Sequence, residues 1–526
     1  MNQYTEHYWK IEKNKQNFEK MLDYMQTLDD FDQKLNLAMY LADYFVYHNT
    51  GYYVSSVLEK FFVDFAQSIK VDLSDIQDKK NSILHVLTYG YKTGGHTRVI
   101  ERWIENAPTN QIHSVIQLKT NENKLIALEN SVKSKNGEFV SLDNSLSVRE
   151  KAIELRKIAM QYEYIILHTH MEDPIATIAF GSNDFTRPVL LYNHASHHPW
   201  IGKSIADLVL DIEKDDPVTK EKRGITNTYF LGVPVKEISM KVPNKKEIRE
   251  KLGLPTNKKI IVTCGSAARY VSIQGKHFLD YLIEIMDDDT CCYVIGVKPK
   301  NREWKSRIKK SGKDIKLLGY INFNEGFLDY LKSADLYLDS YPLCGGTATI
   351  DAISSGTPIL SLESVYPQFD YLTKTSAYCK TKEEFIYKAK KVLCDKNFSK
   401  VLYDELKNSL IEYQSIAVWN QKVENLYKIA PKYHCVKDIS NIKEYSEPND
   451  LSVLCNVIVD KKFLNKKEIE LLSIRKIREK INYGDLYKRQ GVPFIFQVLS
   501  YKKLGVKMKV FKLFGITIYS YVKKKM

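Results

Sequence analysis

Two successive runs of apolar strands that alternate with helices constrain the fold of this chain more than any other feature. The first run begins at Ser82 and ends with YFLGVPV at 229–235. The second begins with KIIVTCG at 259–265 and ends with ILSL at 359–362. Strands that alternate with helices are joined by right-handed crossovers and form mainly parallel sheets. The pattern predicts an α/β chain with two Rossmann-like domains that face a cleft.

The flanks of these runs predict a further division of the chain. Residues 1–80 predict helices only, because apolar residues recur at steps of three and four along 35–48 and 52–69. These helices can pack on the next domain or bind a partner helix. A polar stretch at 241–259 predicts an interdomain linker with a short helix. We therefore expect four regions, namely a helical extension (1–80), a first Rossmann-like domain (81–240), a second Rossmann-like domain (241–430) and a C-terminal extension (431–526).

The C-terminal extension ends in a basic tail with interleaved aromatic residues. Tyr501–Met526 holds eight Lys, no acidic residue and five aromatic residues. Such a tail can bind an anionic membrane surface, where each Lys contributes about 1 kcal/mol. It can also be a solubilising end or a nucleic-acid arm. The net charge of the whole chain, +14, permits all three partners and decides among none of them.

Cysteine usage and apolar runs indicate the compartment. The eight Cys of the 526 residues form no C-x-x-C pair, and several lie in apolar strand-like runs. This pattern predicts a reducing compartment, no disulfide framework and no zinc site. The polar N-terminal segment predicts no signal peptide, and no apolar run approaches about 20 residues. We expect a cytoplasmic protein.

The stretch from Ser340 to Leu362 predicts an anion site. A short strand, DLYLD at 335–339, leads into the turn GGTAT and then a helix. Unpaired N–H groups and the helix dipole at such a start favour a phosphate. The glycines allow close approach, and the hydroxyls can add hydrogen bonds. The residues concerned are Gly345, Gly346, Thr347 and Thr349.

The same stretch has a plainer interpretation. It can be an ordinary strand–turn–helix connection of an α/β sheet. Asp351 can accept hydrogen bonds from ribose hydroxyls, or it can simply favour the helix N-terminus.

Two other loops carry candidate binding groups. The first, Tyr89–Arg98, contains Gly94 and Gly95 in a turn that resembles a phosphate-approaching one. It lacks G-x-G-x-x-G, so a dinucleotide is disfavoured. In the second, Gly265–Lys276, the cations Arg269 and Lys276 can balance the charge of a leaving diphosphate. Either cation can instead be a solvated surface charge.

The segment NHASHHPWIG at 193–202 supplies candidates for acid–base chemistry. A neutral His at the carboxyl end of a strand is a suitable general base near pH 7. His194 is the preferred candidate. His197 and His198 follow in the same segment, and His168 and His170 at the end of another strand compete for the role.

Metal chemistry is not expected. H-x-x-H-H is not a zinc-protease pattern, since no Glu stands between its first two His. The acidic run 287–289 predicts a solvated turn on the amino side of the sheet.

The segment LYLDSYPLCGGTATIDAISSGTPILSL at 336–362 resembles the donor-site motif of glycosyltransferases with the GT-B fold. Within that group it is similar to O-GlcNAc transferase and to bacterial cytoplasmic N-glycosyltransferases. The C-terminal K-x-F-K-L-F-G-I-x-I-Y-S resembles the ends of bacterial surface-glycan transferases. The resemblance implies that the first Rossmann-like domain binds the acceptor and the second binds a nucleotide-sugar.

The resemblance also implies roles for individual residues. The turn and helix start, Gly345 to Thr349, would hold the UDP diphosphate, and Asp351 would meet the ribose. Lys276, with Arg269 as second choice, would be the basic residue, and Tyr320 would lie where the nucleobase binds. The turn departs from O-GlcNAc transferase because no His precedes its Thr pair. Leu343 stands where many retaining enzymes of this fold have Glu, which favours inversion.

Together these features predict an inverting, metal-independent glycosyltransferase without a cofactor. The donor would be a nucleotide-sugar, UDP-linked, and the acceptor a surface glycan on a lipid carrier at the cytoplasmic face of the membrane. A protein acceptor is the variant of this hypothesis. The alternatives are a UDP-sugar epimerase of the same fold and a basic protein without enzymatic activity that binds membrane or nucleic acid. Under the transferase hypothesis no nucleic acid is expected as a partner.

Overall fold

The computed structural model describes most of the chain up to residue 437 and three strands near its end. The described residues are 5–91, 95–121, 124–214, 216, 218–235, 243–270, 272, 277–321, 326–364, 368–437, 497–503, 506–513 and 516–523. The chain forms two compact units. One combines Met1–Leu22 with Tyr40–Val459, and the other combines Asp23–Met39 with Asp460–Met526.

The N-terminal region is helical, as the sequence predicts. It forms α1 (Thr5–Gln26), α2 (Phe31–Tyr47) and α3 (Ser56–Ser68). The side chain of Ser55 accepts a hydrogen bond from the Leu58 amide and so caps the start of α3. Glu59 of α3 is completely buried.

The first sheet is fully parallel and has the strand order of a Rossmann fold. The strand at Ser82–Leu87 is buried along its whole length, as expected for a central strand covered on both faces. The strands in spatial order are β3 (Phe139–Ser141), β2 (Ile112–Gln117), β1 (Ser82–Leu87), β4 (Tyr164–His168), β5 (Val189–Tyr192), β6 (Leu208–Asp211) and β7 (Thr228–Phe230).

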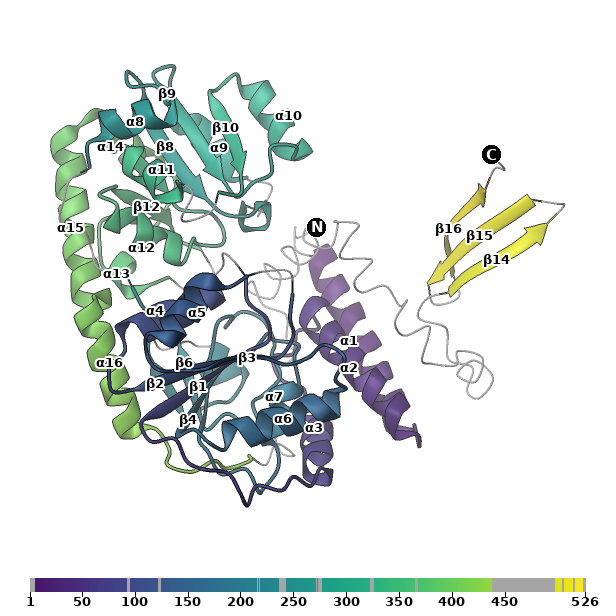
Figure 1. Cartoon of the computed structure of the whole chain (residues 1–526). Coiled ribbons are helices and arrows are strands. Elements are labelled where there is room, and N and C mark those ends of the chain that lie inside the picture. Colours follow the sequence, from purple (N-terminus) through teal and green to yellow (C-terminus); the bar gives the residue numbers. More distant parts are fainter. Residues whose placement is uncertain are drawn as a thin grey trace. The chain divides into compact units, whose positions relative to one another are not determined.

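Helices cover both faces of this sheet. The helices α4 (Gly95–Asn106) and α5 (Ile126–Lys133) pack on each other. The helices α6 (Val148–Ala159) and α7 (Ile175–Phe180) form a second group, and α3 packs on α7. Figure 1 shows the two groups on opposite sides of the sheet. A π-helical turn at Val218–Lys222 follows β6.

The second sheet repeats the same order with parallel strands. Each strand pairs in parallel with its neighbours, and the longest register runs from Lys259↔Thr290 to Cys264↔Ile295. The strands in spatial order are β10 (Ile315–Gly319), β9 (Thr290–Ile295), β8 (Lys259–Cys264), β11 (Leu336–Leu338), β12 (Ile359–Leu362) and β13 (Tyr378–Cys379).

The helices around the second sheet begin and end at recognisable caps. In α10 (Arg302–Ser311), the side chain of Asn301 caps the start by accepting from the Trp304 amide, and Gly312 ends the helix with φ of +68°. Gly253 ends another helix in the same way with φ of +65°. The helices are α8 (Lys245–Leu252), the 3₁₀ turn η2 (Ala267–Tyr270), α9 (Phe278–Ile285), α10 (Arg302–Ser311), α11 (Phe327–Ser333), α12 (Thr347–Ser354), α13 (Asp370–Thr373), α14 (Lys382–Cys394) and α15 (Lys396–Gln414). The chain then returns to the first sheet, where Trp419 of α16 (Ile416–Ile429) contacts Trp103 and the Tyr164 hydroxyl donates to the Tyr427 carbonyl (Figure 1).

The basic tail contains a sheet that the sequence analysis did not predict. The strands β14 (Gln497–Lys503), β15 (Val506–Leu513) and β16 (Ile516–Lys523) are antiparallel in this order. In the described ranges no helix is both long and apolar enough to cross a membrane. The fold is therefore two Rossmann-like sheets with a helical N-terminal extension and a basic C-terminal tail, as expected.

Candidate functional site

The candidate donor site lies at the topological switch point of the second sheet, where ligands of such sheets bind. The strand order reverses between β8 and β11, so the loops after these two strands meet at the carboxyl edge. The guanidinium of Arg269, in the loop after β8, donates to the carbonyl of Cys344 in the loop after β11. The Leu343 amide donates to the Arg269 carbonyl at 3.3 Å. The predicted Arg269 therefore contacts the predicted turn.

A buried carboxylate, Asp339, supports the turn from below. Its Oδ1 accepts from the amides of Ser340 (2.8 Å) and Gly345 (2.6 Å), and its Oδ2 accepts from the hydroxyl of Ser361 at 3.0 Å. Burial raises the pKa of Asp339 to about 6, although these hydrogen bonds and Arg269 oppose the rise. A Cβ atom on Gly345 would lie 2.7 Å from Oδ1 of Asp339, so this position requires glycine.

The start of α12 presents few groups to a ligand. Gly346 precedes the helix with φ of +54°, a conformation that favours glycine. Thr349 is buried, and its hydroxyl donates to the Gly346 carbonyl (2.7 Å) and lies 2.5 Å from the hydroxyl of Tyr371. Thr347 is partly exposed, and among the described residues its hydroxyl has no hydrogen-bond partner. The Thr347 hydroxyl is thus available to a ligand, while the Thr349 hydroxyl holds the turn.

Asp351 pairs with two arginines of α4, a contact that the sequence analysis missed. Its Oδ2 lies 3.2 Å from Nη1 of Arg98, and its Oδ1 lies 3.0 Å from Nη2 of Arg102. Arg102 also donates to the carbonyl of Pro234 at 3.4 Å. A carboxylate offers about four lone-pair sites, so one more hydrogen bond to a ribose hydroxyl remains available.

The remaining predicted donor residues differ in what the structure shows of them. Gly95 is the exposed first residue of α4. Tyr320 follows β10, and its side chain is 64% exposed, so its ring is accessible to a ligand. Nearby, burial lowers the pKa of Arg98, and Asp351 opposes this shift. Gly94 and Lys276 lie outside the described residues.

A second group of candidate residues lies at the carboxyl edge of the first sheet. His194, two residues after β5, lines a hollow of about 320 Å³ together with His96, His170 and Trp200. The rings of His96 and His194 stack with their centroids 3.8 Å apart. Burial, and then the neighbouring histidines, hold the pKa of His194 well below its ordinary value. These surroundings favour the neutral form of His194, in which one ring nitrogen keeps its lone pair.

The other histidines proposed as bases have different surroundings. His168 is fully buried within the sheet, and its Nδ1 lies 2.9 Å from Nε2 of His194. Nδ1 of His170 lies 3.7 Å from a carboxylate oxygen of Glu172. Burial, then His198 and then Arg269, lower the pKa of His197. His197 is thus close to Arg269 of the second domain.

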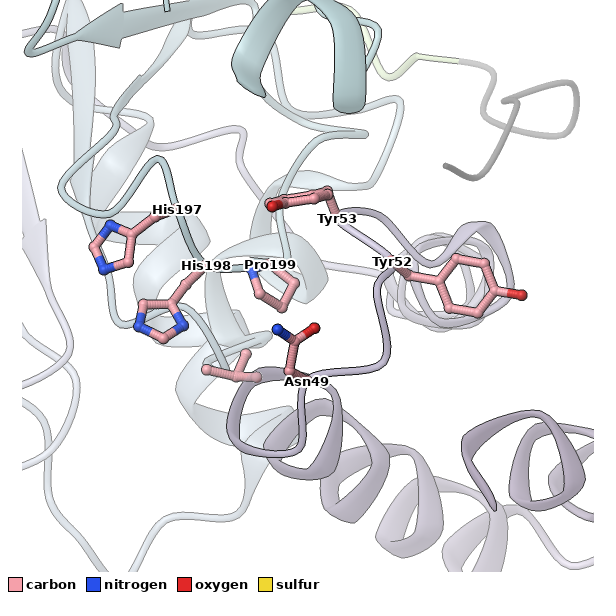
Figure 2. Close-up of a pocket in the computed structure, with 7 residues that line it drawn as sticks. Asn49, Tyr52, Tyr53, His197, His198 and Pro199 are labelled. Atoms are coloured by element: carbon pink, nitrogen blue, oxygen red, sulfur yellow. The ribbon is translucent and has the colours of Figure 1, made fainter. Parts of the chain in front are cut away.

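The loop that carries His197 and His198 also lines a smaller hollow of about 260 Å³. Figure 2 shows His198 and Pro199 on one side of it, with Asn49 and Tyr53 from the connection between α2 and α3 on the other. The guanidinium of Arg223 donates to the His198 carbonyl and lies 5.4 Å from the centre of the Tyr53 ring. The N-terminal helical extension therefore takes part in shaping this loop.

Glu213 is a further acidic group near the donor turn that the sequence analysis did not single out. Burial, then Asp216 and Asp211, raise the pKa of Glu213 to about 8. Burial and then Asp339 raise the pKa of the Cys344 thiol in the turn, and Glu213 is close enough to add a smaller effect in the same direction. In the part of the chain that the structure describes, no group of His, Cys, Asp and Glu side chains could hold a metal ion.

Solved structures share the fold of this chain. The crystal structure of Anabaena Alr3699/HepE in complex with UDP-glucose is 14% identical, covers 66% of this chain and 100% of its own, and has a TM-score of 0.51. A glycosyltransferase from Rickettsia africae ESF-5 is 13% identical over 66% of this chain and 98% of its own, with a TM-score of 0.50. A Thermobaculum terrenum O-GlcNAc transferase mutant is 11% identical over 86% of this chain and 83% of its own, with a TM-score of 0.48.

The similarities to the Anabaena and Rickettsia structures establish the fold. The chain has the GT-B fold, in agreement with the expectation from its sequence. A scan against protein-family models and a search of curated proteins found no match. The activity must therefore be argued from the residues of this chain.

Proposed function

We propose that this protein transfers a sugar from a UDP-sugar to an acceptor hydroxyl. The observation that carries the proposal is the turn Gly345–Gly346–Thr347 at the switch point of the second sheet, held by Asp339 and contacted by Arg269. The Alr3699/HepE structure with the same fold holds UDP-glucose, which supports a UDP-linked donor. In this proposal residues 81–240 form the acceptor domain and residues 241–430 the nucleotide-sugar domain.

The donor side would act by positioning charge where the diphosphate leaves. A guanidinium has five N–H donors, and Arg269 uses one on the Cys344 carbonyl, so others can face the β-phosphate. The Thr347 hydroxyl and amide lie at the start of α12, where the helix dipole favours an anion. Such fixed donors stabilise the negative charge that develops in the transition state. Lys276 is proposed as a second cation, Tyr320 as the nucleobase contact and Asp351 as the ribose contact.

The acceptor side would supply the base. The Nδ1 atom of His194 takes the proton of the acceptor hydroxyl, and the oxygen forms a bond to C1 of the sugar. The bond from C1 to the diphosphate oxygen breaks, and its electron pair leaves with UDP. Attack from the face opposite the leaving group inverts C1, and Leu343 at the position of a Glu in many retaining enzymes agrees with this outcome. The charge carried by Arg269 makes the departure independent of added metal in this proposal.

The acceptor is proposed to be a surface glycan on a lipid carrier at the cytoplasmic face of the membrane. The support is the basic composition of residues 501–526, which suits an anionic lipid surface. A protein acceptor is the variant that the experiment must separate from this one.

A donor panel without added metal tests the proposal. UDP should raise the melting temperature, and one UDP-sugar should release UDP only when an acceptor is present. Arg269→Gln should lose both effects, whereas the control Arg149→Gln, at an exposed position of α6, should keep them. Conversion of a UDP-sugar without any acceptor would indicate an epimerase instead. If no nucleoside diphosphate stabilises the protein, the proposal is wrong.

A further inference from the structure

Four histidines follow one another across the first sheet. His113 lies in β2, His85 in β1 and His168 at the end of β4, while His194 follows β5. The strands β2, β1, β4 and β5 are neighbours in this order. The row therefore crosses the switch point of the sheet and ends at the candidate base.

The ring nitrogens of these histidines are within hydrogen-bond distance of one another. Nδ1 of His113 lies 3.0 Å from Nε2 of His85, and Nδ1 of His85 lies 3.0 Å from Nε2 of His168. Nδ1 of His168 lies 2.9 Å from Nε2 of His194. At the far end, Nε2 of His113 lies 3.3 Å from Oε1 of Gln111, which is partly exposed. The same atom types meet in the same order at every step.

Burial favours the neutral form of all four rings. Burial holds the pKa values of His85, His168 and His194 well below their ordinary value and lowers that of His113 to about 3. The charged or titratable neighbours Lys135, beside His113, and His96, beside His168 and His194, act in the same direction. A neutral imidazole has one N–H donor and one nitrogen lone pair.

The direction of one hydrogen bond therefore fixes which ring nitrogen carries the hydrogen in each of the four histidines. The Gln111 oxygen is an acceptor, so Nε2 of His113 carries the hydrogen and its Nδ1 carries the lone pair. Nε2 of His85 must then donate to His113, Nε2 of His168 must donate to His85, and Nε2 of His194 must donate to His168. This leaves Nδ1 of His194 as a lone pair, and no described residue of the structure is hydrogen-bonded to it.

We propose that His113, His85 and His168 are positioning residues that hold His194 as the Nε2–H tautomer, with its Nδ1 lone pair ready for the acceptor hydroxyl. The inference rests on the proposed sugar transfer, in which that lone pair takes the hydroxyl proton. Without the row, both tautomers of His194 would be populated, and one of them presents an N–H to the hydroxyl.

Nitrogen NMR of ¹⁵N-histidine-labelled full-length protein reads the tautomers directly. Single substitutions of the four histidines assign their signals. The expected result at pH 7.5 is a protonated Nε2 and an unprotonated Nδ1 on His85, His113, His168 and His194. A protonated Nδ1 on His194, or an imidazolium anywhere in the row, would overturn the inference.

A kinetic comparison separates positioning from mere support of the fold. His113→Phe removes the far end of the row, and His434→Phe is the matched control. His434 is another buried histidine with both ring nitrogens engaged, by Asp207 at 2.7 Å and by the Phe180 carbonyl at 2.9 Å. We expect His113→Phe to lower kcat at least about tenfold without changing the KM of the UDP-sugar, because a general base contributes about 10²–10⁴-fold. His434→Phe should lower stability but leave kcat unchanged.

The outcomes of the two experiments are distinct. A kcat of His113→Phe equal to that of the wild type, or a change in KM alone, would overturn the positioning role. A wild type that transfers no sugar would overturn the proposed function, and the role of His194 with it. The NMR result would still show whether the row orders the tautomer of His194.

Discussion

Replacing Asp351 by Asn tests the ion pairs between helix α12 and helix α4. Asp351 is 8% exposed and Arg102 is 3% exposed at a separation of 3.0 Å. At that distance two unit charges attract by about 5 kcal/mol at an effective dielectric constant of about 20. Desolvation of both groups offsets much of this attraction, but the removal of one partner leaves a buried charge and costs about 3–5 kcal/mol. We therefore expect Asp351→Asn to lower the free energy of unfolding by about 3–5 kcal/mol.

A double-mutant cycle isolates this contact from other effects of the substitution. Arg102→Met should cost about as much as Asp351→Asn, and the double variant should lose about 1–3 kcal/mol less than the sum of the two. Arg98→Met should cost less, about 1 kcal/mol, because Arg98 is 21% exposed. Urea denaturation followed by circular dichroism measures each value. Additive losses, within about 0.5 kcal/mol, would refute the reasoning.

Three further predictions concern the supports of the site. Glu59→Ala leaves the buried amides of Gly202, Lys203 and Ser204 without their acceptor. It should therefore lower the free energy of unfolding, measured by urea titration, by about 3 kcal/mol or more. The control Asp64→Ala, at an exposed position of the same helix, should change it by less than about 0.5 kcal/mol. The pKa of Asp339 rises from 3.8 to about 6 on folding, so its contribution to stability is present below pH 3.8 and is lost as the pH rises through 6. Relative to the wild type, the free energy of unfolding of Asp339→Asn should therefore rise by about 2.4 kcal/mol between pH 4 and pH 7, and a constant difference would contradict this account. Arg269→Gln should weaken UDP binding at least about tenfold in fluorescence titrations, because one charge-assisted hydrogen bond contributes about 1.5–3 kcal/mol.

Most of the architecture can be predicted from the sequence, because the apolar periodicity and the caps that define helices and strands are patterns of residues close together in the chain. The helix at 302–311 follows from its pattern alone, and Asn301 and Gly312 at its ends explain why its bounds are sharp. The edge strands β3 and β13 were missed because they have three and two residues, too few for an apolar pattern to show. The strands β14–β16 were not predicted, because only the charge and the aromatic content of the tail were considered. The order of the residues carries a strand signal, since apolar and basic residues alternate along most of 506–513.

The site was predictable only where its residues are adjacent in the chain. The turn at Gly345 and Gly346 lies within one segment, so its chemistry is visible in the sequence. The pairing of Asp351 with Arg102 joins residues 249 positions apart, and only the packing of α4 near α12 brings them together. His85 and His113 look like ordinary strand residues, since their contact depends on the register of β1 with β2, in which His85 lies opposite Val115.

Titration calorimetry of UDP tests the central claim of this account most directly. The wild type should bind UDP at one site, and Gly253→Asn should bind it equally well, because its Cβ would meet open space and Asn tolerates a φ of +65°. Gly345→Ala should lose the binding, because its Cβ would lie 2.7 Å from Oδ1 of Asp339 and displace the turn. Absence of UDP binding by the wild type, or binding by Gly345→Ala with unchanged affinity, would contradict the assignment of this turn as the donor site.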